Sequence, residues 1–188
     1  MSARPQKFPI TTVTVFVVTA IATALIFPFP QIDAALRRTP DMYALHEWWR
    51  IVTPVFINPE GWLQIVFNFT GIALLGTIVE RRFGWARWLA IYFGSAVVGE
   101  IAGHAWKPSG AGSSVSVAGL LGAAAVLLAT ARAPQPRIGA VAIVIGAATL
   151  CYFRDLHGPP ILMGAALAYV MHRIAHPLPP RRSMTRIV

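Results

Sequence analysis

Long apolar runs alternate with short polar segments along the whole chain. A helix needs about 20 apolar residues to cross the roughly 30 Å hydrocarbon core of a bilayer. The first run, 10–29, contains no charged residue, and five further runs follow, of which the last three are weaker. The pattern predicts an all-α membrane protein with six spanning helices, at about 10–29, 61–79, 88–106, 114–131, 138–153 and 158–175.

The segments between these runs predict one compact domain over residues 1–176. A basic start before an apolar run resembles a signal peptide, but the run is long and no small-x-small cleavage site follows it in FPFPQID. We therefore expect an uncleaved first helix. The long segment 30–60, rich in Trp, Tyr and Phe, suits an interfacial element. The basic tail 177–188 is expected to be disordered and held near anionic lipid.

Composition agrees with a membrane environment. Of 188 residues, 56% are hydrophobic and 12% charged, whereas a soluble domain has about a quarter charged residues. This composition excludes a disordered chain, which would be polar and charged. The single cysteine, Cys151, permits no internal disulfide and leaves the redox compartment open.

The net charge of +9 is distributed unevenly across the predicted topology. With the N-terminus inside, the outer segments hold five basic and five acidic residues. The inner segments hold eleven basic residues against only Glu80. The eleven basic residues are Arg4, Lys7, Arg81, Arg82, Arg87, Arg132, Arg137, Arg173, Arg181, Arg182 and Arg186. This positive-inside asymmetry predicts that both termini are cytoplasmic. The basic balance therefore indicates topology, and we expect no nucleic acid partner.

A few strongly polar side chains fall inside the predicted spans or open them. Each costs several kcal/mol in a bilayer unless it is paired or wetted, so each is a functional candidate. They are Gln64, Asn68, Glu100, His104, Ser113, Ser114, Ser116 and His157. All of these groups are expected to converge on the outer leaflet. A serine at a helix start, a histidine from another helix and an amide pair can supply a nucleophile, a general base and oxyanion donors.

Four motifs in these spans carry a family resemblance. EWWRIVTPVF contains a Trp-Arg motif at Trp49 and Arg50, and LQIVFNFTGIALLGTIVERRFG has a polar residue four positions before Asn68. GSSVSVAGLLGA and LHGPPILMG open the fourth and sixth spans. Together, over residues 43–170, they resemble the rhomboid intramembrane serine proteases of the minimal six-helix type.

The resemblance implies a function and a set of site residues. Ser114 would be the nucleophile and His157 the general base of a dyad that uses no acid. Asn68 and the Ser114 backbone N–H would form the oxyanion hole with Gly112, and Gln64 stands where the family usually has a histidine. The substrates would be transmembrane segments of membrane proteins. We expect no metal, no small-molecule cofactor, and a place in a cell membrane, the inner membrane of a bacterium.

Besides Gln64, and Ala118 where an aromatic residue is common, two residues depart from the family pattern. Val115 and Pro160 stand where the fourth and sixth helices usually have glycine. Larger residues there can hold the two helices apart, and a misplacement of about 1 Å can cost on the order of 100-fold in rate. The alternative is therefore a catalytically inactive rhomboid-like protein that binds transmembrane helices.

Simpler structural roles stay open for the same residues. Ser114 can cap its helix, and a shift of register would make Ser113 or Ser116 the reactive serine. His157 can bond a loop carbonyl, and Asn68 can join two helices. Glu100 and His104, four residues apart, are expected to form a structural pair. His172 and His176 have metal-ligand spacing, but no carboxylate or cysteine lies near them in the sequence.

Overall fold

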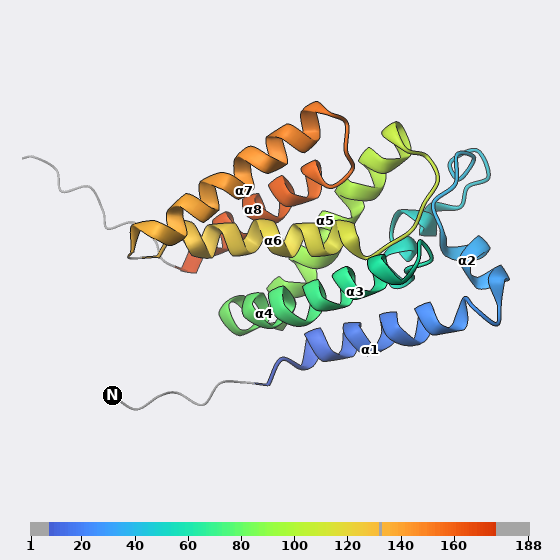
Figure 1. The fold of residues 1–188 in the computed structure, drawn as a ribbon, viewed down its shortest axis with the longest axis horizontal. Coiled ribbons are helices and arrows are strands. Elements are labelled where there is room, and N and C mark those ends of the chain that lie inside the picture. The colour runs from blue at the N-terminus through green and yellow to red at the C-terminus, as the bar shows by residue number, and fades with distance from the viewer. Residues whose placement is uncertain (1–7, 132, 176–188) are drawn as a thin grey trace, which may run out of the picture.

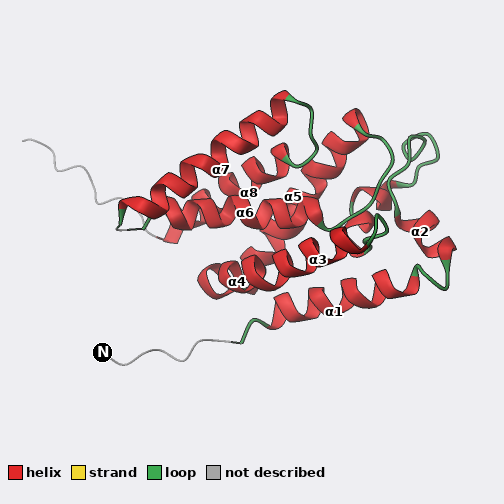
Figure 2. Ribbon diagram, in the orientation of Figure 1, coloured by secondary structure: helices red, strands yellow, loops and turns green. Residues whose placement is uncertain are grey.

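The computed structural model of the chain describes residues 8–131 and 133–175, and in that part every regular element is helical (Figures 1 and 2). The predicted tail, 177–188, lies outside the described residues. The α-helices are α1 (Ile10–Leu25), α2 (Pro30–Leu36), α3 (Trp62–Gly71), α4 (Thr77–Phe83), α5 (Trp85–Trp106), α6 (Ser114–Ala129), α7 (Pro134–Tyr152) and α8 (Gly158–Ala175). Two 3-10 turns, η1 (Trp48–Ile51) and η2 (Thr53–Phe56), and a π-helical segment, η3 (Ile72–Gly76), complete the order.

Helices lie over all six predicted ranges, with shifts at their ends. α1 ends at Leu25, earlier than predicted, because Pro28 disfavours helical geometry in the residue before it. α5 and α7 begin earlier than predicted, at Trp85 and Pro134. Proline is well suited to the first turn of a helix, where its missing N–H is not needed.

The second predicted span is a continuous helical segment of three parts, α3, η3 and α4. It continues to Phe83, past the predicted end at 79. Glu80 lies in this extension, and its carboxylate accepts hydrogen bonds from the Thr11 N–H (2.9 Å) and the Thr12 N–H (2.7 Å). The first N–H groups of a helix have no partner within the helix, so this carboxylate stabilises the start of α1. Figure 1 shows α1 running beside α3 and α4.

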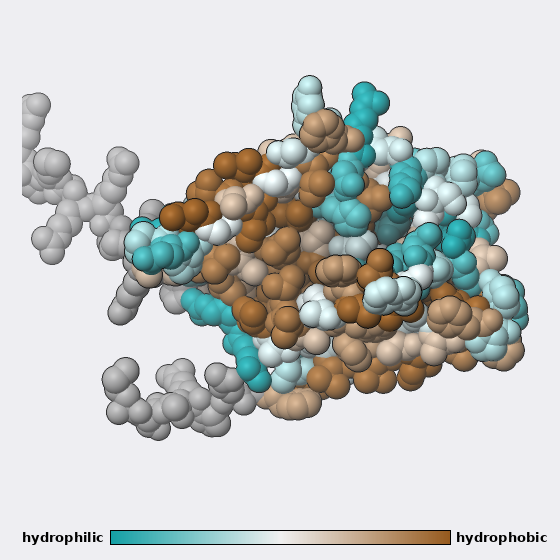
Figure 3. Space-filling view, in the orientation of Figure 1, coloured by the Kyte–Doolittle hydropathy of each residue, from teal (hydrophilic) through white to brown (hydrophobic). Residues whose placement is uncertain are grey.

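The surface of the helices is largely apolar. In Figure 3, hydrophobic residues cover most of the visible face, and hydrophilic residues gather toward its two ends, with the larger group at the end where α2 lies. Among the described residues, two helical segments are long and apolar enough to cross a membrane, Trp62–Phe83 and Pro134–Tyr152. Ile10–Leu25 and Ser114–Ala129 are apolar but shorter. The count of six spans and the cytoplasmic termini stay predictions.

Helix α6 lies at the centre of the bundle, in contact with α5, α7 and α8. It approaches α8 closely through two glycines. A side chain at Gly122 would meet the Ile161 carbonyl oxygen, and one at Gly164 would meet the Gly119 carbonyl oxygen. These contacts are with backbone, which cannot move aside as a side chain can. The glycines therefore set how near the starts of α6 and α8 come to each other.

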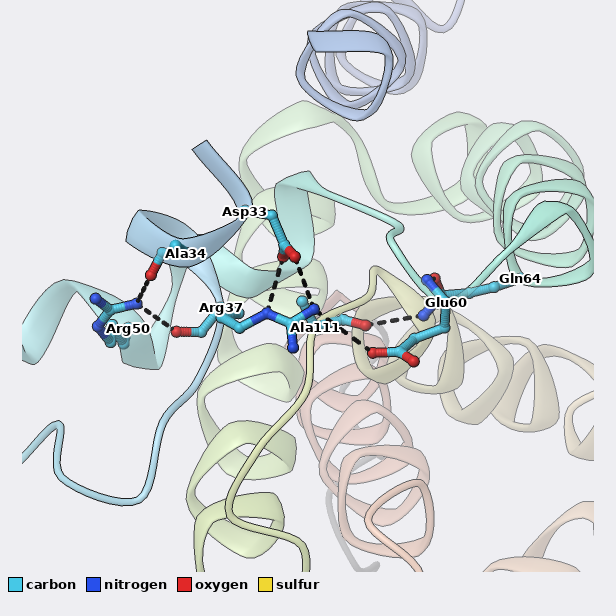
Figure 4. A network of polar contacts seen from close by, with 7 residues as sticks. All are labelled: Asp33, Ala34, Arg37, Arg50, Glu60, Gln64 and Ala111. Carbon is cyan, nitrogen blue, oxygen red and sulfur yellow. Dashed lines mark hydrogen bonds and ion pairs between the residues drawn. The ribbon is translucent and has the colours of Figure 1, made fainter. Parts of the chain in front are cut away.

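The segment between α1 and α3 is held by buried Arg50. Its Nη1 donates to the carbonyl oxygens of Ala34 (2.8 Å) and Arg37 (2.6 Å), and its Nε donates to a Glu47 carboxylate oxygen (2.7 Å). Figure 4 shows how these contacts continue through the Arg37 side chain to Asp33 and Glu60. The Trp-Arg motif therefore has a structural role, because its arginine ties this segment together.

Candidate active site

Ser114 and His157 come together although 43 residues separate them. The distance from Ser114 Oγ to His157 Nε2 is 2.9 Å, within the range of a hydrogen bond. Ser114 is the first residue of α6, and His157 directly precedes α8. The close crossing of these two helices therefore places a nucleophile and a base in contact, in the arrangement that activates a serine.

Both side chains open into a cavity of about 430 Å³. Its lining combines the dyad with Gln64, Gly112, Val115 and Leu156, and with five charged residues: Arg37, Arg38, Glu60, Glu100 and Lys107. A space of this size is large enough for a short stretch of peptide beside Ser114.

Asp155 is a third residue of the site, and the sequence did not predict it. Its Oδ1 lies 2.7 Å from His157 Nδ1 and accepts the His157 backbone N–H at 2.9 Å. Burial raises the pKa of Asp155, but the hydrogen bonds from His157 and the charges of His157 and Lys107 outweigh it, so the pKa is lowered overall. The Asp-x-His spacing was the available signal, because an aspartate often bonds the backbone two residues on.

Gln64 lines the cavity but both ends of its amide are engaged. Its Nε2 donates to the Ala111 carbonyl oxygen (2.8 Å), and its Oε1 accepts from the Glu60 N–H (2.9 Å), as Figure 4 shows for the first contact. Gln64 thereby fixes the segment just before α6. Gly112 lies in the same segment with φ +156°, and an added side chain there would meet Gln64 Nε2. The Gly112 N–H donates to the Pro54 carbonyl oxygen at 3.0 Å.

Asn68 is buried and is not among the residues that line the cavity. Its Nδ2 donates to Asn58 Oδ1 at 2.6 Å, and the same oxygen accepts from the Ser113 N–H at 3.1 Å. Because the Ser113 N–H can only donate, Asn58 must present its oxygen there, and Asn68 must present its NH₂ group. Asn58 is a second residue that the sequence did not predict, although an asparagine before a proline is a turn signal.

Val115 and Pro160 both pack against one small residue of α5, Gly99. A side chain added at Gly99 would lie 2.7 Å from Val115 Cβ and 3.3 Å from Pro160 Cγ. The space left by Gly99 therefore accommodates both larger residues. Val115 and Pro160 were expected to be able to hold the serine and the histidine apart. In the structure, Ser114 Oγ and His157 Nε2 are instead in contact.

Glu100 and His104 have different partners from those expected. Glu100 forms a buried ion pair with Arg38, whose Nη2 also donates to the Lys107 carbonyl oxygen at 2.9 Å. His104 packs edge-on against the ring of Tyr43, with 4.4 Å between ring centroids. Each residue is thus structural, but they are not paired with each other. Within the described ranges, no three His, Cys, Asp or Glu residues gather as a metal site would require.

Comparison with known families decides the identity of the fold. The rhomboid domain matches residues 45–173, which is more than half of the chain. The chain belongs to the rhomboid family. Membership in this family implies an integral membrane protein, and the close approach of Ser114 and His157 lies within the matched region.

Relatives of this rhomboid protein carry protease names. The rhomboid protease GluP of Bacillus subtilis is 37% identical over 83 residues, which cover 44% of this chain and 16% of that protein. The putative rhomboid protease YdcA of the same organism is 35% identical over 79 residues, 40% of this chain and 39% of that protein. Rhomboid-like protease 2 of Toxoplasma gondii is 30% identical over 86 residues, 44% of this chain and 30% of that protein. The matches thus span less than half of each relative.

Proposed function

We propose that this rhomboid protein is an intramembrane serine endopeptidase that cleaves transmembrane segments of membrane proteins. The observation that carries the proposal is the 2.9 Å contact between Ser114 Oγ and His157 Nε2 at the edge of the cavity. The protease names of its relatives support the same reaction class.

The proposed reaction follows the chemistry of an activated serine. Ser114 Oγ attacks a peptide carbonyl carbon while His157 Nε2 takes the hydroxyl proton. His157 then gives that proton to the leaving amine, and an acyl group remains on Ser114. Water, with His157 again as base, releases the acyl group as a carboxylate and restores the serine.

The oxyanion would be held by groups at the start of α6. The Ser114 N–H, among the first of the helix, has no acceptor inside it and adds the positive end of the helix dipole. We retain Asn68, Gln64 and Gly112 as further donors. Gln64 would exchange its bond to Ala111 for the oxyanion, and Gly112 would exchange its bond to Pro54. Asn68 would have to turn away from Asn58.

The proposal includes a membrane arrangement. Six helices would span a cell membrane, expected to be a bacterial inner membrane, as one domain over residues 1–176 with both termini cytoplasmic. The charge asymmetry of the sequence supports this topology. The cavity, bordered by the residues before α6 and α8, would then open toward the outer face, and the substrates would be transmembrane proteins in the same bilayer.

The alternative is an inactive rhomboid-like protein that binds transmembrane helices. Val115 and Pro160 favour it as departures from the active pattern, but both are accommodated at Gly99 with the dyad in contact. The two proposals differ in one measurable property, the reactivity of Ser114.

The test is cleavage of a single-span substrate, with a helix-breaking residue near its outer end, by the purified protein in liposomes. Ser114→Ala should lower the rate at least about 100-fold, since a nucleophile cannot be replaced by a methyl group. Ser116→Ala is the matched control, because this serine of α6 is buried and is not in the cavity lining. A fluorophosphonate probe should label the wild type at Ser114. Equal cleavage by Ser114→Ala and wild type, or an unlabelled folded wild type, would overturn the proposal.

A further inference from the structure

His157 is held at two points by one carboxylate oxygen. Asp155 Oδ1 accepts the backbone N–H of His157 (2.9 Å) and lies 2.7 Å from its Nδ1. On the opposite side of the ring, Nε2 faces Ser114 Oγ at 2.9 Å. The backbone contact fixes the residue relative to Asp155, and the ring contact fixes its rotation. The three side chains thus form a continuous line from carboxylate to imidazole to hydroxyl.

This contact determines which nitrogen of His157 carries the proton. An ionised carboxylate can only accept a hydrogen bond, so Nδ1 must be the donor. In the neutral ring, Nε2 is then left with its lone pair toward Ser114. That is the tautomer a general base needs. Without an acceptor at Nδ1, the ring would be free to place its proton on Nε2, where it could not take the serine proton.

The charge of Asp155 acts in the same direction. The groups that face it are His157 and Lys107, both of which lower its pKa against the effect of burial, so the carboxyl is ionised at neutral pH. When His157 takes the serine proton, the resulting imidazolium lies beside this carboxylate. The side chains of His157 and Asp155 are 37% and 44% exposed. Solvent screening therefore makes the effect smaller than in a buried triad.

We propose that Asp155 is a positioning residue that completes an Asp155–His157–Ser114 triad in this chain. The inference rests on the proposed protease function. It differs from the dyad that the family resemblance implies, because it adds an acid that orients the base.

A purely structural role for Asp155 makes different predictions. The bond from Oδ1 to the His157 N–H, and the bond from the Gly158 N–H to the Asp155 carbonyl oxygen (3.2 Å), form a turn that leads into α8. If only the turn matters, Asp155→Asn should behave as wild type, because its amide oxygen can still accept the His157 N–H. Asp155→Ala would then lower both stability and activity.

The experiment compares Asp155→Asn and Asp155→Ala with wild type. Asp41→Asn is the control, because it removes the charge of an exposed acid that is not part of the site. The measurements are kcat and KM for the single-span substrate between about pH 5 and 9, and the midpoint of thermal unfolding. We expect Asp155→Asn to lower kcat about 10- to 100-fold with unchanged KM and midpoint. A loss confined to kcat would show that the carboxylate acts on the reaction and not on substrate binding.

A second readout does not depend on activity. In protein labelled with ¹⁵N-histidine, whose five histidines can be assigned by substitution, His157 should carry its proton on Nδ1. Asp155→Ala, which removes the acceptor at Nδ1, should change that signal and leave the others in place. Activity of Asp155→Asn within about twofold of wild type, together with an unchanged His157 signal in Asp155→Ala, would overturn the inference alone. An unreactive wild type whose His157 tautomer still depends on Asp155 would instead refute the protease function.

Discussion

At the scale of single residues, Asn58 organises the start of α6. One oxygen accepts from Asn68 and from the N–H and hydroxyl of Ser113, and its Nδ2 donates to Thr23 at 3.3 Å. Ser113 directly precedes the proposed nucleophile. A fully buried amide thus connects α1, α3 and the residue before α6. The orientation of Ser114 depends on this residue even though Asn58 is outside the cavity lining.

Asn58→Ala should therefore reduce stability and reactivity together. It leaves the N–H of buried Ser113 without its acceptor, which costs about 1–3 kcal/mol in free energy of unfolding. The measurements are thermal or denaturant unfolding in detergent and the rate of fluorophosphonate labelling of Ser114. Asn68→Ala is the comparison for the unfolding measurement alone, since Ser113 keeps its acceptor there. If Asn58→Ala left both quantities at wild-type values, the role assigned to Asn58 would be wrong.

At the scale of helices, the crossing of α6 and α8 determines the site. Gly122 of α6 faces backbone atoms of α8, and Gly164 of α8 faces backbone atoms of α6. The crossing therefore has no room for a side chain at either position. Ser114 and His157 lie at the starts of these same two helices. A change in the distance between the helices will therefore be transmitted to the distance between nucleophile and base.

Gly122→Ala is expected to destabilise the protein and to slow Ser114 labelling at least about 10-fold, because its methyl group would push against the Ile161 carbonyl oxygen. Gly146→Ala on α7 is the matched control. No atom lies within 4 Å of a side chain added there, so this change should be neutral or slightly stabilising. Unfolding midpoints and labelling rates of both variants check the prediction. Similar values for the two would show that the crossing tolerates a larger separation.

The helices were predictable and several of their partners were not. Apolar runs predicted a helix in each of six ranges because a membrane-spanning helix is specified by local composition. The start of α6 at Ser114 followed the motif. Glu100 illustrates the limit: its partner was expected four residues away at His104, but it is Arg38, 62 residues distant. A buried charge takes the partner that the tertiary fold provides, which local spacing does not reveal.

The triad shows the same limit at shorter range. Asp155 and His157 are two residues apart, yet the sequence alone placed Asp155 only among the outer acids. Its contact with the ring depends on the turn before α8, where Arg154 adopts a positive φ of 56°. Such a backbone conformation is uncommon outside glycine and is not predictable from an arginine. The Ser114–His157 pairing came from the family resemblance, whereas its third member came from the loop geometry.

At the scale of the whole molecule, charges are arranged differently at the two ends of the helices. Three arginines of the segment between α1 and α3 are each paired with an acid: Arg37 with Asp33, Arg38 with Glu100, and Arg50 with Glu47. The Arg50 guanidinium holds the pKa of Glu47 below its usual value of 4.5. Arg81 and Arg87 are exposed and lie beyond the opposite end of the second span. In the sequence around them, Glu80 is the one acidic residue. This contrast favours the predicted orientation, with the cavity on the outer face.

The orientation can be tested by labelling single cysteines from one side of the membrane. Cys151→Ser provides the background, and each cysteine replaces an exposed residue near a helix end. The predicted inner positions are Phe8, Trp85 and Ile138, and the predicted outer positions are Phe29, Ser109 and Phe153.

A membrane-impermeant maleimide added to intact spheroplasts should label the outer positions at once and the inner positions only after permeabilisation. The reason is that residues on opposite sides of a roughly 30 Å hydrocarbon core cannot both be reached from outside. A permeant maleimide on every variant controls for intrinsic reactivity. Labelling at both Trp85 and Ser109 from the same side would mean that α5 does not cross the membrane. In that case the six-span topology, and with it the outward-facing cavity, would have to be abandoned.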